Sequence, residues 1–208
     1  MKRTADARGF TLVELVMFIV LVGIAFGALI LAMNQFTRYS ADPLQSKQAL
    51  AVAESLLEEV ELMPFTFCDP DDPNAPTATS AAGCSGGTAG SEEAGVNLGP
   101  ESGENRYWPT LGTGPFDNVS DYNGFTMVAG SGAIPSGGIR DIAGNQVLPT
   151  GLENYSASVA VTRVGTTFIG GTAVSDDAVK ISVTVTPPNG NAVTLEGYRA
   201  RYAPNTAP

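Results

Sequence analysis

One segment near the N-terminus limits what this chain can fold into more than any other feature. Residues 10–33 read FTLVELVMFIVLVGIAFGALILAM and carry a single charge, on Glu14. From Leu15 the uncharged apolar run is 19 residues long. As a helix it would extend about 28 Å at about 1.5 Å per residue, close to the thickness of a bilayer core. The run therefore predicts a transmembrane helix over residues 10–36.

Two other interpretations of this segment remain open. A buried helix of a soluble domain is usually shorter and is rarely apolar on every side. A secretory signal peptide also begins with basic residues, but its apolar core runs about 7–15 residues and ends at a small-residue cleavage site. The residues after the run, Asn34-Gln35-Phe36, do not form such a site. Length and flanking sequence thus favour a span that is retained.

Charge is distributed unevenly along the chain. Residues 1–9 carry Lys2, Arg3 and Arg8 against one acid, Asp6, whereas the whole chain has a formal net charge of -10. The basic side of a span tends to stay in the cytoplasm, so we expect a cytoplasmic N-terminus and an outward-facing body over residues 40–208. An acidic chain is also unsuited to nucleic acid, because phosphate binding needs clustered Lys and Arg.

A second helical pattern follows the apolar run. Asp42 can cap a helix, Pro43 suits the first helical position, and Gln45 could complete a capping box. Beyond them, polar and apolar residues fall on opposite sides at 100° per residue, which predicts an amphipathic outer helix over residues 37–63. The polar sector holds Lys47, Glu54, Glu58 and Glu61, and the apolar side holds Leu50, Ala53, Leu56, Leu57 and Val60.

The simplest arrangement joins these two helices into one long stem. Pro43 cannot donate a backbone hydrogen bond, and its ring crowds the carbonyl group of Tyr39. We therefore expect a kink or a short break near residues 39–43.

Residues 64–208 predict a loop-rich β domain. The chain contains 24 glycines and 14 prolines, and residues 69–118 show weak periodicity, which indicates loops. Further along, the strand patterns are clearer, and a turn at Pro187–Asn191 predicts a β-hairpin. The expected fold class is α+β, with the long N-terminal helix packed on a C-terminal antiparallel β-sheet. The expected strands are Gly124–Ala129, Tyr155–Arg163, Val179–Thr186 and Ala192–Tyr202.

The residues Arg8-Gly9-Phe10-Thr11-Leu12-Val13-Glu14, followed by the apolar run, resemble the N-terminus of type IV prepilins and type II secretion pseudopilins. The resemblance implies that residues 1–9 are a leader, and that a membrane prepilin peptidase cuts after Gly9 and methylates the new amine of Phe10. It also implies that Glu14 meets the N-terminal amine of a neighbouring subunit during assembly. Alternatively, Glu14 lies near the membrane interface and stays solvated. The chain is expected to be the substrate of an enzyme and not itself an enzyme.

A closer resemblance covers roughly the first third of the chain. Residues 40–43, 47–59 and 64–72 are similar to the MshD family, minor pilins of the mannose-sensitive haemagglutinin (MSHA) pilus. This implies a low-copy subunit whose partners are other pilin subunits. The subunit would cross the inner membrane once, with a periplasmic C-terminal domain, and would then enter the surface fibre.

Two other functions stay open. A minor pseudopilin of a type II secretion system shares the same N-terminus, and gene context would separate the two. An enzyme tethered by one helix is a third class. It is disfavoured because the chain has no histidine, the commonest general base near neutral pH, and no recognisable nucleophile motif.

The remaining candidate residues cluster after the second helix. Cys68 and Cys84 lie on the expected outward side, which favours a disulfide, although free thiols or a bond to another chain remain open. The acidic residues Asp69, Asp71 and Asp72 fit a solvated turn or a calcium ligand set, but their spacing is not that of an EF-hand. Two cysteines are too few for a cysteine-built zinc site. We expect no metal and no cofactor.

Overall fold

The computed structural model describes residues 9, 11–87, 98–130, 132–134, 136–147, 151–164 and 178–201. The chain divides into two compact units, Met1–Leu44 and Gln45–Pro208. One helix, α1 (Leu12–Leu62), contributes to both units. Most of the expected leader, together with Phe10, lies outside the described residues.

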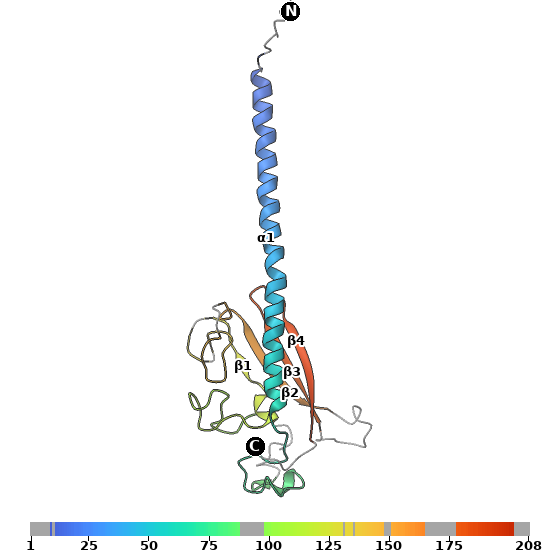
Figure 1. Ribbon diagram of the computed structural model, residues 1–208, viewed down its shortest axis with the longest axis vertical. Coiled ribbons are helices and arrows are strands. Elements are labelled where there is room, and N and C mark those ends of the chain that lie inside the picture. The colour runs from blue at the N-terminus through green and yellow to red at the C-terminus, as the bar shows by residue number, and fades with distance from the viewer. Residues whose placement is uncertain are drawn as a thin grey trace, which may run out of the picture. The chain divides into compact units, whose positions relative to one another are not determined.

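The first unit contains the apolar part of α1 (Figure 1). The helix begins just after Thr11, whose hydroxyl oxygen accepts a hydrogen bond from the backbone N–H of Glu14 at 3.3 Å. The segment Leu12–Phe36 has a mean hydropathy of 3.0 and none of it is buried. It is long and apolar enough to cross a membrane, as the sequence predicts.

Helix α1 continues through Pro43 without interruption. The expected helix start at Asp42-Pro43 is therefore not a start, and the expected short break does not occur. A helix can tolerate an interior proline, although the missing N–H and the ring clash cost about 3 kcal/mol. A bend at Pro43 remains a prediction.

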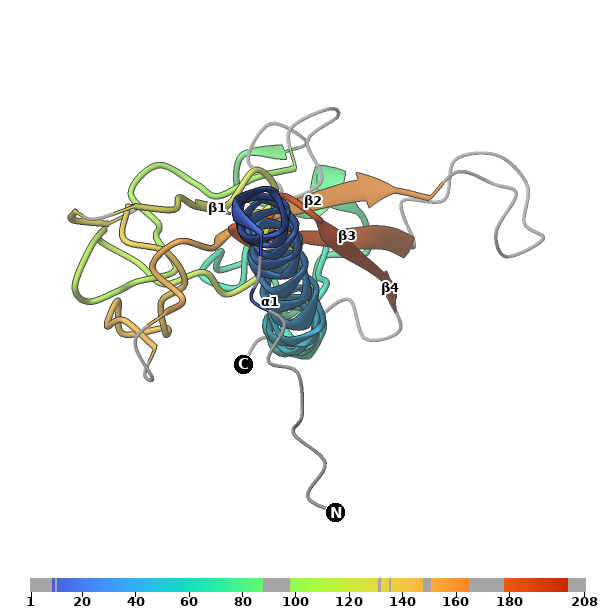
Figure 2. The same ribbon diagram turned by 90° about the horizontal axis from the view of Figure 1, so that it is seen from above.

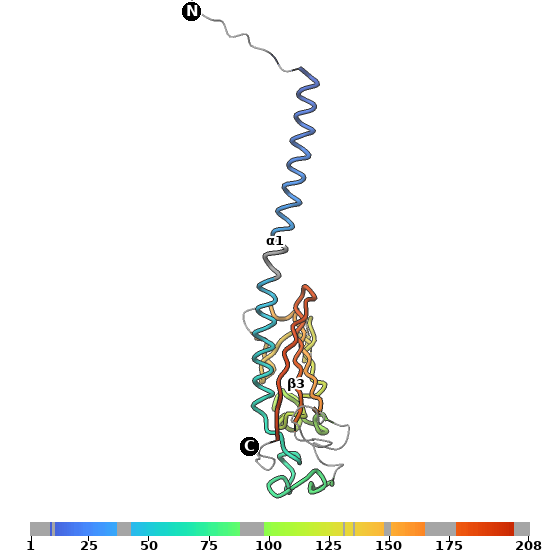
Figure 3. The backbone as a smooth tube through the Cα atoms, turned by 90° about the vertical axis from the view of Figure 1, so that its right-hand side faces the viewer, coloured from blue at the N-terminus to red at the C-terminus, as the bar shows by residue number. Residues whose placement is uncertain are grey.

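The second unit pairs the outer part of α1 with a four-stranded sheet, as the expected α+β fold class requires. The strands follow the chain in the order β1-β2-β3-β4 and all neighbours are antiparallel. Figure 3 shows α1 running beside the strands, and Figure 2 shows the loops of residues 98–147 extending from the β1 edge. The strands are β1 (Thr126–Met127), β2 (Ser156–Arg163), β3 (Ala178–Thr186) and β4 (Val193–Ala200).

The expected hairpin is formed by β3 and β4, with Val183 opposite Leu195. The turn between them places Gly190 at φ +81°, a left-handed conformation that glycine adopts without steric cost. The expected first strand is shorter than the sequence suggested. It is confined to β1, because Gly124 at φ +82° precedes it and Val128 pairs separately with Ser136.

The core lies between one side of α1 and one face of the sheet. Along β2 and β3 every second residue is buried, so the alternation seen in the sequence corresponds to a dry face and a wetter one. The helix contributes a stripe at three- and four-residue spacing, which is the period of one helical face. The stripe residues are Ala49, Ala53, Leu56 and Val60, and the strand residues are Ala157, Val159, Val161, Val179, Ile181, Val183 and Val185.

Small residues let the helix come close to the sheet. Ala49 and Ala53 are fully buried, and Gly197 of β4 faces the helix on the other side of the contact. A Cβ atom added at Gly197 would lie 3.0 Å from Cδ1 of Leu57, tighter than ordinary van der Waals contact. The hydroxyl group of Tyr155 also donates a hydrogen bond to Oε1 of Gln48 at 2.8 Å.

The buried stripe generates a direct test of the packing. Ala53→Leu should overfill the space between helix and sheet and lower the free energy of unfolding by about 1–3 kcal/mol. Ala51→Leu makes the same change two residues away on an exposed position and should stay within about 0.5 kcal/mol of wild type. The measurement is urea unfolding of the full chain in detergent. Equal effects of the two substitutions would contradict the assigned helix face.

Candidate functional site

The N-terminal residues singled out by the sequence lie in the first unit. Gly9 is exposed, and nothing lies within 4 Å of the position where a Cβ atom would stand. Its partner in the expected cleavage site, Phe10, falls outside the described residues. The structure leaves the cleavage and methylation at Gly9 and Phe10 as predictions.

Glu14 occupies the first turn of α1, where the positive end of the helix dipole favours an acid. The side chains around it are apolar and fully open to their surroundings. Leu12 is 79 % exposed and Phe18 is 63 % exposed. A continuous apolar surface of this size is typical of a segment that contacts lipid or other protein chains.

A disulfide closes the loop that follows α1 in the second unit. Cys68 and Cys84 are bonded, as the sequence predicts. Asp72 reinforces the closure, because its carboxylate accepts hydrogen bonds from the backbone N–H and the hydroxyl group of Ser85, both at 2.8 Å. It also accepts from the backbone N–H of Asn74 at 2.7 Å. Asp72 therefore holds the disulfide loop and does not join Asp69 and Asp71 in a shared acidic site.

Asp69 and Asp71 instead meet acids from two other loops. Their carboxylates lie together with that of Asp117 within 4.8 Å, and further groups at the same spacing add three more acids. Sequence reasoning missed these partners, because the three loops are far apart in the chain and carry no spacing motif. The added residues are Glu101, Glu104 and Asp121.

Four of these carboxyl groups have unusually high pKa values. Burial, reinforced by neighbouring carboxylates, raises the pKa of Asp69 and Asp121 to about 7 and that of Asp117 to about 6. The same causes raise the pKa of Glu104 to about 9. Each pKa exceeds the ordinary carboxyl value of about 4. Ionising these groups therefore opposes folding as pH rises from about 4 towards 7, and for Glu104 towards 9.

A buried ion pair joins α1 to the loop before β1. The guanidinium group of Arg106 donates two hydrogen bonds of 2.6 Å to the carboxylate of Glu59, one from Nε and one from Nη2. Nη1 of Arg106 donates to the carbonyl oxygens of Arg140 at 3.3 Å and Asp141 at 3.2 Å. Tyr122 donates its phenolic hydrogen to Oε1 of Glu59 at 2.7 Å. Burial, reinforced by Glu59, raises the pKa of Tyr122 and keeps it a neutral donor.

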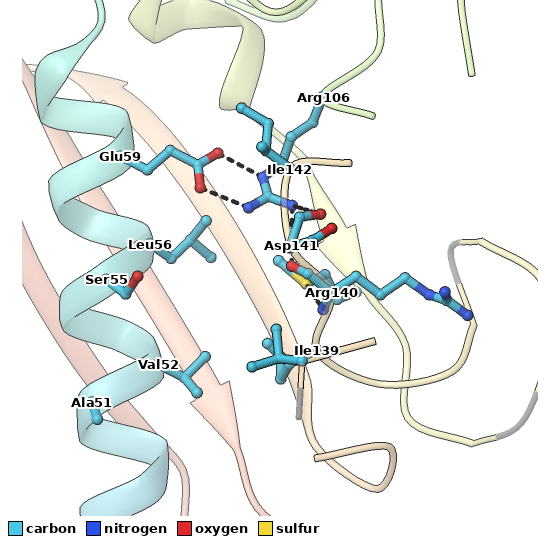
Figure 4. Close-up of a pocket in the computed structure, with 12 residues that line it drawn as sticks. Ala51, Val52, Ser55, Leu56, Glu59, Arg106, Ile139, Arg140, Asp141 and Ile142 are labelled. Atoms are coloured by element: carbon cyan, nitrogen blue, oxygen red, sulfur yellow. Dashed lines mark hydrogen bonds and ion pairs between the residues drawn. The ribbon is translucent and has the colours of Figure 1, made fainter. Parts of the chain in front are cut away.

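This pair forms one end of an open groove between α1 and the loop of residues 139–142 (Figure 4). The groove encloses about 480 Å³. Its helix wall includes Val52 and Leu56, and its opposite wall includes Ile139 and Ile142. The lining is mainly apolar.

The position of Glu59 around the helix is one sequence signal of the ion pair. Glu59 falls outside the polar sector that contains Glu54, Glu58 and Glu61, and borders the apolar stripe at 100° per residue. An acid at the border of an apolar stripe is a candidate to pair with a buried basic group. Its partner Arg106, 47 positions away, could not be inferred from the helix pattern.

Comparison with known proteins adds no relative. No protein-family model matches the chain, and no curated protein or solved structure is significantly similar to it.

The ion pair generates a stability prediction. Glu59→Leu should leave the guanidinium group of Arg106 buried without a counter-charge and cost about 3 kcal/mol, the lower end of the usual range, because Glu59 retains 21 % exposure of its side chain. Glu58→Leu, on the exposed neighbour, is the matched control and should cost far less. The double variant Glu59→Leu/Arg106→Met should recover part of the loss. Urea unfolding measures all three, and a single variant as stable as its control would refute the role of the pair.

Proposed function

We propose that this chain is a minor pilin-like subunit of a type IV pilus of the MSHA kind. It would be processed by a prepilin peptidase and assembled through its N-terminal helix. The observation that carries the proposal is the unburied apolar segment Leu12–Phe36 with a single acid, Glu14, in its first turn. The Gly9-Phe10 pair just ahead of that segment supports the same proposal.

The energetics of Glu14 favour assembly over simple anchoring. An acid inside a membrane span costs a few kcal/mol on insertion scales, less near the membrane edge, and such residues usually have a partner. Cleavage after Gly9 would create an amine on Phe10. In an assembled fibre, the amine of one subunit and the carboxylate of Glu14 in the next would neutralise each other.

The basic residues ahead of the apolar segment support the proposed topology. Lys2, Arg3 and Arg8 would hold the N-terminus in the cytoplasm, and the second unit would face the periplasm before it enters the fibre. The bond between Cys68 and Cys84 supports this, because disulfides persist in oxidising compartments such as the bacterial periplasm. In this proposal the partners are the peptidase, other pilin subunits and the inner membrane.

Processing can be tested with the two residues at the expected cut. Co-expression with a prepilin peptidase should yield a product that begins at Phe10 and carries a methylated amine, as read by intact-mass and N-terminal peptide mass spectrometry. Gly9→Val should block cleavage, because a branched side chain would obstruct the approach of the backbone to the protease. An uncut wild-type chain beside an active peptidase would refute the proposal, as would a cut after residue 30.

Assembly can be tested at Glu14. Glu14→Ala should leave the chain cut, inserted and folded, but should reduce its association with the fibre by roughly a hundredfold. The reason is that removing one member of a buried charge pair costs about 3 kcal/mol, and each 1.4 kcal/mol is about a factor of ten.

The measurement is the amount of subunit in sheared pili relative to the inner membrane. Met17→Ala, one turn along the same exposed segment, is the uncharged control and should assemble. Wild-type levels of Glu14→Ala in the fibre would limit the segment to anchoring. Recovery of the wild-type subunit only with a type II secretion pseudopilus would favour the pseudopilin alternative.

A further inference from the structure

Three loops of the second unit bring six carboxylates into one cluster at the end of α1. The loops contribute Asp69 and Asp71, then Glu101 and Glu104, and then Asp117 and Asp121. Asp69, Glu104 and Asp117 form its centre, since every pair of them shares a group whose oxygens lie within 4.8 Å. The other three acids each join one side of that triangle. We call these six residues the carboxylate cluster.

The carboxylate group of Asp121, within the cluster, has only one of its two oxygens hydrogen-bonded to the described residues. Asp121 is 1 % exposed. Its Oδ2 accepts hydrogen bonds from the backbone N–H groups of Asp117 at 2.9 Å and Asn118 at 2.7 Å. Among the residues that the structure describes, Oδ1 of Asp121 and Oδ1 of Asp117 are both buried without a hydrogen-bond partner. An unsatisfied buried carboxylate oxygen is costly, and a bound cation is one way to satisfy it.

The basic residue on the loop that carries Glu104 is engaged elsewhere. Arg106 follows Glu104 by two residues, but its guanidinium group is held by Glu59 and by the carbonyl oxygens of Arg140 and Asp141. The cluster therefore consists of acids that face one another.

We propose that the carboxylate cluster binds a divalent cation, calcium, at the group formed by Glu104, Asp117 and Asp121, with the orphaned Oδ1 of Asp121 among the ligand atoms. This site is independent of the proposed assembly role of α1. It differs from the sequence interpretation, which considered Asp69, Asp71 and Asp72 together and predicted no metal.

The ligand chemistry selects calcium over other cations. All six side chains offer hard oxygen atoms, which suit magnesium, calcium or manganese and not zinc or copper. Calcium takes six to eight oxygens at about 2.3–2.6 Å in irregular geometry, so ligand oxygens up to about 5 Å apart can share one ion. Magnesium requires a near-ideal octahedron and keeps several waters. A ligand set collected from separate loops fits calcium better than magnesium.

Calcium would tie these loops to the rest of the second unit. The short 3-10 helix η3 (Val119–Tyr122) carries Asp121 and is attached to the end of α1. The backbone N–H of Val119 donates to the carbonyl oxygen of Pro64 at 3.1 Å, and Nδ2 of Asn118 donates to the hydroxyl oxygen of Thr66 at 2.9 Å. The ion would add a crosslink from this base to the loop that carries Glu104.

The test uses the full chain in detergent after treatment with EGTA. Isothermal titration with CaCl2 measures binding, and the fluorescence of Trp108, the single tryptophan, follows thermal unfolding. At about a hundredfold excess over Kd, calcium should raise Tm by about 5 °C or more. The same concentration of MgCl2 should give a smaller shift.

Asp121→Asn keeps the shape of the side chain and one oxygen for the backbone N–H groups. It should fold and weaken calcium binding by about tenfold or more, since ligand charge tunes calcium affinity. Glu104→Gln tests a second loop in the same way. Glu54→Gln, on an exposed position of α1, removes the same charge and should bind like wild type.

The site would be overturned if wild type showed neither heat of binding nor a shift in Tm. It would also be overturned if Asp121→Asn and Glu104→Gln bound calcium like wild type. A loss of equal size in Glu54→Gln would show charge screening in place of a site.

Discussion

The packing of one narrow stripe of α1 against the sheet positions the rest of the second unit. Ala49 and Ala53 keep the backbones close, and Leu56 and Val60 fill the space beyond them. Burial of such side chains yields about 25 cal/mol per Å² of apolar surface, but only where helix and sheet present matching faces. The period of two along β2 and β3 and the helical period of α1 supply those faces. Once these two faces pack together, the position of the end of α1 determines where the loops of the second unit can contact it.

Polar groups then secure the attachment on either side of that stripe. Glu59 reaches from the helix to Arg106 and Tyr122, so a buried charge pair fixes the loop before β1. A pair of this kind contributes little net stability relative to apolar packing, but breaking it is costly. This asymmetry makes it a determinant of loop position. The carboxylate cluster lies beyond the helix end and has the opposite character, because its members repel one another once they are ionised.

Helix α1 serves two environments with one backbone. Over Leu12–Phe36 it is apolar on every side and unburied, whereas over its last turns it is amphipathic. In proteins most of the stability of a helix comes from tertiary packing of one face. In the apolar segment that support would have to come from lipid or from neighbouring subunits. Under the proposed function, the first segment provides assembly and the second carries a folded body, so a change in either can be studied without the other.

The sequence alone determined the elements with strong periodicity. The span, the amphipathic helix and the β3–β4 hairpin were all predictable, because hydrophobic period and turn chemistry are local properties. The expected compartment and the count of two cysteines favoured the bond between Cys68 and Cys84 without excluding free thiols, and the structure contains that bond. Local signals were misleading at Asp42-Pro43, where a typical helix start lies inside α1.

Only the tertiary structure decided which polar residues meet. Glu59 and Arg106 are 47 residues apart, and the acids of the cluster come from three loops with no common motif. Their pairing depends on chain directions set by the core, and these cannot be read from local pattern. Asp72 shows the same limit, since it adjoins Asp71 in sequence but binds Ser85 in space. Local sequence determined the helix and strands of this protein, and long-range packing determined the chemistry between them.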